Sequence, residues 1–291
     1  MSEVEAFQNL ACNDKLHIGP PCDDFRCNAL ELFSGCSLLS TLCKRKGMNV
    51  ISVGESICLH KFRIVSLCLI LCISTTISKD NDLDSNATIK RDFASDYVQN
   101  LISSKTFDYI HASPECRTYS CASGNTHRSV RNYNVSPQSH EADAMLLQLY
   151  FNISEQLRKN INATVTIENP IGRMQKGSLM KDLFEAELGF ERVFIHYCAF
   201  GRGDKKPTNL WTNDKVLGNI LRRIGGKCNH VNHEEKVQED RHKNFAALPM
   251  QLCELISTYV SSKHTQLKFA KFASKNDHDG NSSMNDSVKL K

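Results

Sequence analysis

The sequence predicts a doubly wound α/β fold built on a mostly parallel sheet. Three observations lead to this prediction. Short apolar runs alternate with helix-periodic segments along most of the chain, which is typical of a sheet with crossover helices. The first two apolar runs are joined by a turn and one short helix, as at the start of a nucleotide-binding α/β unit. A content of 41% apolar residues in 291 is enough for one large core.

The first elements follow from local signals. Residues 29–33 form an apolar run that predicts a strand, and 34–35 are expected to form a turn. Residues 36–46 predict a helix, because Gly47 is a common helix stop. Residues 49–53 predict the second strand.

Later elements repeat this order. We predict strands at 109–112, 165–167 and 192–200, and helices at 142–159 and 249–261. Residues 1–27 show no periodicity and are expected to be an irregular lead-in. From Lys263 to Lys291 the chain is rich in Lys, Asn, Ser and Asp, which predicts a disordered polar tail. The folded domain is therefore expected to span 28–262.

One segment interrupts this pattern. Residues 64–78 form a nearly uncharged run of fifteen residues, short of the roughly 20 needed to cross a bilayer. It can be a buried strand or core helix, a membrane anchor, or part of an insertion. We favour an insertion over 54–79, because joining Val53 to Asp80 gives a strand that ends in acids. Phe, Leu, Ile, Ser and Cys, which have pyrimidine-rich codons as intron ends do, are common in it, so a retained intron kept in frame would explain the segment.

Two strand ends carry reactive side chains. The strand at 109–112 is followed by Pro114 and Cys116, and the strand at 165–167 ends in Glu168. Parallel strands place their carboxyl ends at one edge of a sheet, where α/β proteins bind ligands. A thiol and a carboxyl group at that edge suit an enzyme that attacks an electron-poor ring and protonates it. Taken alone, a cysteine after a strand is more often a small buried apolar residue.

The motifs, in this order, resemble those of the DNA cytosine-5 methyltransferase family, above all its short phage and virus members. The resemblance covers about residues 29–261. It rests on short segments that match the family's motifs in sequence order: Phe33-Ser-Gly35, Asp92-Phe93, Ser113-Pro-Glu-Cys116, Glu168-Asn-Pro170, Gly201 to Asn213, and Ala246-Ala-Leu-Pro249.

The resemblance implies methyl transfer from S-adenosylmethionine to C5 of a cytosine flipped out of DNA. Cys116 would be the nucleophile that adds to C6, and Glu168 would protonate the ring at N3. The residues that would bind the cofactor are Phe33, Ser34, Gly35, Cys36, Glu55, Asp80, Asp92, Phe93 and Pro114. Those that would bind the substrate are Ser113, Asn169, Arg173, Lys205 and Lys206, with Arg173 or Lys205 expected to steady the thiolate or a phosphate.

The sequence departs from the family at several positions. Glu115 replaces the usual proline and would raise the pKa of the Cys116 thiol if it pointed inward. Ser37 and Ala246 replace a glycine and an asparagine. The acid that would bind the ribose is Glu55 as the sequence stands, or Asp80 or Asp82 if the insertion is removed. Only residues 214–245 separate the last two motifs, so we expect either low target specificity or a protein partner that supplies it.

Composition limits the setting. A net charge of +4 permits contact with nucleic acid without requiring it. Thirteen cysteines without a Cys-x-x-Cys pair, and an acidic start at Ser2-Glu-Val-Glu5, indicate a reducing intracellular location, nuclear or cytoplasmic, with no membrane contact. Cys228, His230 and His233 are irregularly spaced, so we predict no metal site.

Three alternatives stay open. The chain can be a pyrimidine-C5 enzyme that acts on RNA or nucleotides. It can also be a degenerate homologue that binds DNA or a partner without catalysis. The third is a membrane-attached protein that uses residues 64–78.

Overall fold

The computed structural model describes residues 26–33, 38–53, 93–120, 126–128, 135–228, 230, 233 and 248–282, with side chains as far as residue 271. The proposed insertion at 54–79 and nearly all of the lead-in at 1–27 lie outside these residues. No helix within the described ranges is long and apolar enough to cross a membrane.

Six strands form one sheet in the order β2-β1-β3-β4-β6-β5. The first four strands run parallel, and β6 is antiparallel to both of its neighbours. Their bounds are β1 Asn28–Leu32, β2 Asn49–Val53, β3 Tyr109–Ala112, β4 Thr164–Pro170, β5 Glu191–His196 and β6 Pro207–Thr212. The predicted doubly wound, mostly parallel sheet is thus confirmed, and the chain has a Rossmann-like architecture.

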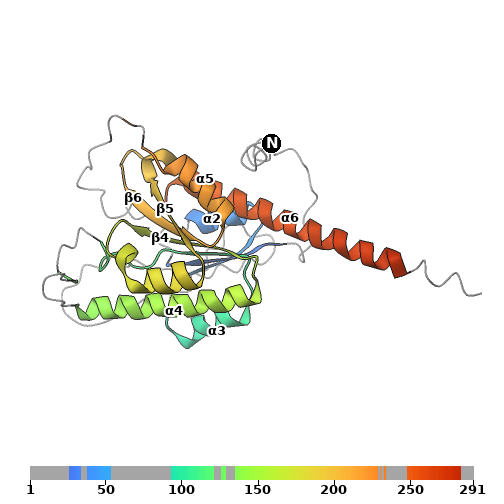
Figure 1. The fold of residues 1–291 in the computed structure, drawn as a ribbon, viewed down its shortest axis with the longest axis horizontal. Helices are drawn as coiled ribbons and strands as arrows, with labels where there is room; N and C mark the ends of the chain where they lie inside the picture. Colours follow the sequence, from blue (N-terminus) through green and yellow to red (C-terminus); the bar gives the residue numbers. More distant parts are fainter. Residues whose placement is uncertain are drawn as a thin grey trace, which may run out of the picture.

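Helices cover both faces of the sheet (Figure 1). One face packs against α3, α4 and the π-helix η4, and the other against α2, α5 and α6. Neighbouring strand residues point to opposite faces, so Tyr109 joins one core and Ile110 the other. The helix bounds are α2 Leu38–Arg45, α3 Asp96–Ser104, α4 Pro137–Lys159, η4 Leu179–Glu187, α5 Lys215–Gly225 and α6 Met250–Ser282.

The helix predicted at 142–159 begins earlier, at Pro137, and two other predicted elements differ more in their extent. The strand predicted at 192–200 stops at His196, and the chain then turns through the 3-10 helix η5, Tyr197–Phe200. The helix predicted to end at residue 261 continues as α6 to Ser282, where we expected a polar tail. Figure 1 shows α6 running past the end of the sheet.

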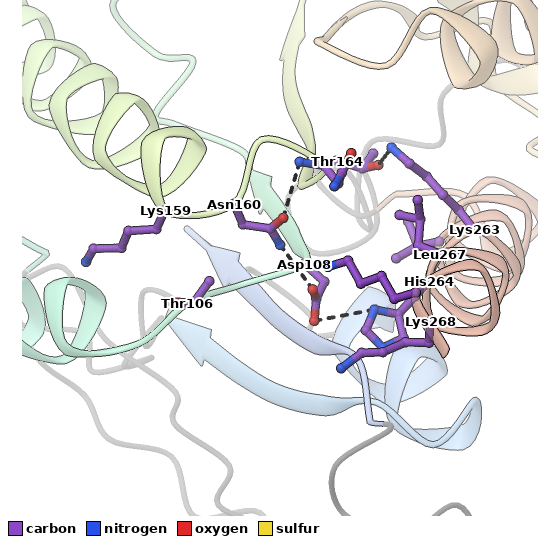
Figure 2. Close-up of a pocket in the computed structure, with 12 residues that line it drawn as sticks. Thr106, Asp108, Lys159, Asn160, Thr164, Lys263, His264, Leu267 and Lys268 are labelled. Atoms are coloured by element: carbon purple, nitrogen blue, oxygen red, sulfur yellow. Dashed lines mark hydrogen bonds and ion pairs between the residues drawn. The ribbon is translucent and has the colours of Figure 1, made fainter. Parts of the chain in front are cut away.

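Two polar contacts hold α6 against the chain just past residue 261. Lys263 Nζ lies 2.8 Å from Asp214 Oδ2, and His264 Nδ1 lies 3.5 Å from Asp108 Oδ2. Figure 2 shows Asp108, Lys263 and His264 among the side chains that line a pocket of about 250 Å³ beside the amino ends of β3 and β4. This pocket is therefore at the opposite edge of the sheet from Cys116 and Glu168.

Candidate active site

The sheet has a switch point between β1 and β3. The chain leaves β1 through α2 to reach β2 on one side, and it leaves β3 through α4 to reach β4 on the other. Because α2 and α4 lie on opposite faces, the connections after β1 and β3 diverge. Open α/β sheets bind ligands in the crevice that such divergence creates.

The turn after β1 begins at a constrained residue. Phe33 has a φ of 60°, which is uncommon for any residue with a Cβ and marks a turn imposed by its surroundings. Its ring packs on Phe93 with centroids 4.9 Å apart, and both rings are buried. These two aromatic residues therefore form an apolar floor where the chain leaves β1. The other cofactor residues predicted in this region, Ser34, Gly35, Cys36, Glu55, Asp80 and Asp92, lie outside the described residues.

The turn after β3 presents Cys116 to solvent. The amide of Ser113 continues the ladder by donating to Leu32 O at 3.1 Å, and Pro114 is buried directly after it. The turn then closes on itself, because the amides of Tyr119 and Ser120 donate to Cys116 O at 3.0 and 2.7 Å. Cys116 is exposed at the tip of this turn.

A histidine of β3 contacts the side chain of Ser113. Its Oγ lies 3.0 Å from His111 Nε2, and His111 Nδ1 lies 2.8 Å from Thr166 Oγ1. Burial lowers the pKa of His111 to about 3, so this ring is neutral near physiological pH. Ser113 therefore has a structural partner in addition to its predicted role in substrate binding.

Glu168 lies at the carboxyl end of β4 with 5% of its surface exposed. Tyr197 Oη donates to Glu168 Oε1 at 2.8 Å, and Lys206 Nζ lies 3.8 Å from the same oxygen. Both contacts fall on Oε1, so within the described ranges Oε2 is the oxygen left for a ligand. The next residue, Asn169, is buried and donates from Nδ2 to Pro114 O at 3.0 Å. This bond ties the end of β4 to the turn that carries Cys116.

Charges around Cys116 act in both directions. Partial burial of the thiol raises its pKa, the Glu168 carboxylate raises it further, and the Lys206 ammonium lowers it. Glu115, whose carboxylate is paired with Arg117 at 3.2 Å, raises the pKa of the thiol by a smaller amount. The net pKa lies above the ordinary thiol value, so the free protein holds Cys116 mainly as a thiol at neutral pH.

The lysine near the thiol is not the one we expected. Lys205 is exposed, whereas Lys206 is only 6% exposed and its Nζ lies 4.8 Å from the centre of the Tyr197 ring. Successive residues of an extended chain point to opposite sides, so only one of the two can face Glu168. Arg173 is half-buried, and its amide donates to Tyr119 O at 2.6 Å. Lys206 is therefore a lysine placed to steady the thiolate, and the roles expected of Lys205 and Arg173 stay predictions.

Sequence reasoning missed the residues that anchor the Cys116 turn. Tyr119 Oη donates to Asp143 Oδ1 at 2.6 Å, and Arg128 binds the same carboxylate through two nitrogens at 2.7 and 3.0 Å. The Arg128 guanidinium also lies 4.3 Å from the centre of the Tyr119 ring. On the opposite side, Gly172 forms a bridge with Ser120. No local sequence signal identifies these residues, because their partners are far apart in the chain.

Comparisons with known proteins find similarity to solved structures and none to curated sequences. The chain matches no protein-family model and no curated protein sequence. It is similar to the structure of a mutant of Spodoptera frugiperda DNMT2, with 12% identity and a TM-score of 0.38 over 77% of this chain and 57% of that one. It is also similar to the S. pombe Dnmt2 methyltransferase, with 14% identity and a TM-score of 0.36 over 75% of this chain and 59% of that one.

The chain thus spans less than two thirds of the length of either structure. At such low similarity, the function must be inferred from the site itself.

Proposed function

We propose that this chain is an S-adenosylmethionine-dependent cytosine-5 methyltransferase that acts on DNA. One observation carries the proposal: Cys116 follows β3, Glu168 lies at the carboxyl end of the neighbouring parallel strand β4, and the Asn169–Pro114 hydrogen bond joins their two segments. A nucleophile and a proton donor fixed relative to each other are what addition to a pyrimidine ring requires. The sequence motifs that resemble the family fall on these same segments.

The described part of the switch point fits the cofactor. Phe33 and Phe93 offer an apolar floor after β1, and Pro114 lies on the β3 side. The bound cofactor would supply an electrophilic methyl group. Phe33, Phe93 and Pro114 would line its site.

The proposed reaction proceeds through a covalent adduct between the protein and the base. The Cys116 thiolate adds to C6 of cytosine, and Glu168 delivers a proton to N3, so that C5 gains enamine character. C5 then takes the methyl group, and a base removes the C5 proton. The Sγ–C6 bond breaks with its electron pair returning to sulfur, and N3 gives its proton back to Glu168, which restores the ring and the free enzyme. Tyr197 holds Glu168 Oε1, which leaves Oε2 for the base, while Lys206 supplies positive charge beside the thiolate.

The target base must leave the stack to reach such a site, so base flipping is part of the proposal. The exposed position of Cys116 at the tip of its turn suits a base that enters from solvent. The short segment at 214–245 leaves little chain for sequence recognition, so a protein partner would supply specificity.

A second candidate is a homologue that binds nucleic acid without catalysis. The raised pKa of Cys116 favours this candidate, because a protonated thiol adds slowly to a pyrimidine. The two candidates differ in one measurable property, the formation of a covalent bond to the base.

The experiment uses DNA duplexes that contain 5-fluorocytosine. Fluorine at C5 cannot leave as a proton does, so an active enzyme stays bonded to the base. Purified protein, with and without residues 54–79, is incubated with S-adenosylmethionine and each duplex, and adducts are counted on a denaturing gel. An RNA of the same sequence and free 5-fluorocytidine are run in parallel.

We expect a DNA adduct that is lost in Cys116→Ser and retained in Cys43→Ala, a matched control at a buried cysteine of α2. An adduct that forms with the RNA or with the nucleoside, but not with DNA, would show that the substrate is RNA or a nucleoside. DNA binding without any adduct, from folded protein of both forms, would establish the second candidate instead.

A further inference from the structure

Four metal-binding side chains meet at the edge of the sheet that carries β5. Cys198 lies in η5, and Cys228, His230 and His233 follow α5. Cys228 Sγ lies 3.4 Å from Cys198 Sγ, 3.0 Å from His233 Nε2 and 3.8 Å from His230 Nδ1. One potential ligand atom from each residue lies within 4.8 Å of all the others.

These separations match those of a tetrahedral zinc centre. Bonds of about 2.3 Å to sulfur and about 2.1 Å to nitrogen place two sulfurs about 3.8 Å apart, and a sulfur and a nitrogen about 3.6 Å apart. The contacts of 3.4, 3.0 and 3.8 Å differ from these values by about 0.4, 0.6 and 0.2 Å. Small side-chain rotations would therefore bring all four atoms to bonding distance.

We propose that Cys198, Cys228, His230 and His233 form a structural Zn²⁺ site. Two thiolates and two imidazoles are a donor set that zinc prefers, and four protein ligands leave no open position for catalysis. On binding, the two thiols lose their protons to solvent and the imidazoles bind through neutral nitrogens.

The sequence prediction of no metal site missed the fourth ligand. Cys198 precedes Cys228 by 30 residues, and only the tertiary structure brings the two sulfurs together. Cys198 is buried, Cys228 and His233 are half-buried, and His230 is exposed. The site is thus close enough to the surface for a metal ion to enter from solvent.

The metal would join two segments that border the proposed active site. Cys198 directly follows Tyr197, the residue that donates to Glu168. Fixing η5 to the chain after α5 would hold the β5–β6 connection, which also carries Lys206, against the end of β4. The role is therefore to position Tyr197 and Lys206, and the metal itself takes no part in a reaction.

The test measures metal content and coordination without any assay of methyl transfer. The full chain is purified in a reducing buffer without chelator, and its zinc content is measured by elemental mass spectrometry. Apoprotein is then titrated with Co²⁺, whose visible and near-ultraviolet bands report tetrahedral geometry and thiolate ligation. Zinc content and the Co²⁺ spectrum do not depend on methyl transfer, so both test the metal site even if the proposed function is wrong.

His230→Ala is the informative variant, because the side chain is exposed and its removal does not disturb the core. Its matched control is His140→Ala, at an exposed histidine of α4. We expect about one zinc per chain in the wild type and in His140→Ala. His230→Ala should bind zinc at least about 100-fold more weakly, since even outer-shell changes cost about 10- to 100-fold.

Three outcomes would overturn the proposal. The wild type could hold well under one zinc per chain after exposure to excess Zn²⁺. His230→Ala could bind zinc as tightly as His140→Ala does. Peptide mass analysis could show a Cys198–Cys228 disulfide in protein kept under reducing, air-free conditions, which would assign the sulfur contact to a redox pair.

Discussion

Substituting Gly172 tests whether the Cys116 turn is held where the structure places it. A Cβ added at this position would lie 2.1 Å from Tyr119 O and 3.0 Å from Tyr119 C. The substitution would therefore push the chain against the turn that carries Cys116. The backbone at residue 172 is not in the left-handed region, so alanine is excluded by contact alone.

The size of the effect follows from the contact distances. Restoring an ordinary carbon–oxygen contact requires residue 172 and Tyr119 to separate by about 1 Å. Overpacking of this kind costs about 1–3 kcal/mol of folding free energy. Misplacing a reacting group by about 1 Å slows catalysis about 100-fold. Gly172→Ala should therefore lose a modest part of the stability and most of the rate.

The assay is the rate of adduct formation with 5-fluorocytosine DNA, together with urea unfolding of the same samples. Gly177→Ala is the matched control, because its added Cβ would meet nothing closer than 3.4 Å. We expect the control to react like the wild type, and Gly172→Ala to react about 100-fold more slowly while still folded. Equal adduct rates and stabilities in the two variants would refute the proposed packing of Gly172 on the turn.

Three further predictions concern single side chains. Tyr197→Phe removes the hydrogen bond to Glu168 and should slow adduct formation about tenfold, with a urea midpoint close to that of the wild type; an unchanged rate would contradict the role of Tyr197. Alkylation of Cys116 by iodoacetamide should accelerate as pH rises past the ordinary thiol value. In Glu168→Gln, Cys116 should be alkylated faster at pH 7 than in the wild type, because the substitution removes a charge that raises the thiol pKa. A slower reaction would contradict this effect of Glu168 on the thiol. Asp214→Ala should cost about 3–5 kcal/mol in unfolding experiments, since Asp214 is buried, caps α5 and pairs with α6; a cost below 1 kcal/mol would show that this pairing contributes little. Burial alone would raise the pKa of Asp214, but the hydrogen bond and the charge of Lys263, with smaller contributions, lower it below 3.8 in the folded protein. The stability that the Asp214 carboxylate contributes is therefore present above pH 3.8 and is lost as the pH falls through the lower pKa of the folded state.

Local sequence patterns were sufficient for the first four strands and for the positions of the two central candidates, whereas β6 was not predicted. Apolar runs predicted β1 to β4, and Cys116 and Glu168 follow such runs directly. Because parallel strands end at a common edge, the sequence alone predicted that these two residues would lie near each other. The fold class followed from the same alternation of strands and helices.

Choices between neighbouring residues could not be made from the sequence. Whether Lys205 or Lys206 faces Glu168 depends on the direction in which each side chain leaves the β5–β6 connection. The extent of α6 was also hidden, because Lys263 and His264 belong to a polar stretch whose partners, Asp214 and Asp108, lie far away in the chain.

The sequence by itself therefore determined the fold class and the strand ends that carry Cys116 and Glu168, because strands and turns are encoded by residues close together in the chain. Tertiary structure alone decided that Tyr197 and Lys206 contact Glu168, and that Cys198 joins Cys228 and its two histidines. Such contacts depend on long-range packing, which sets the distance between segments that local patterns describe only separately.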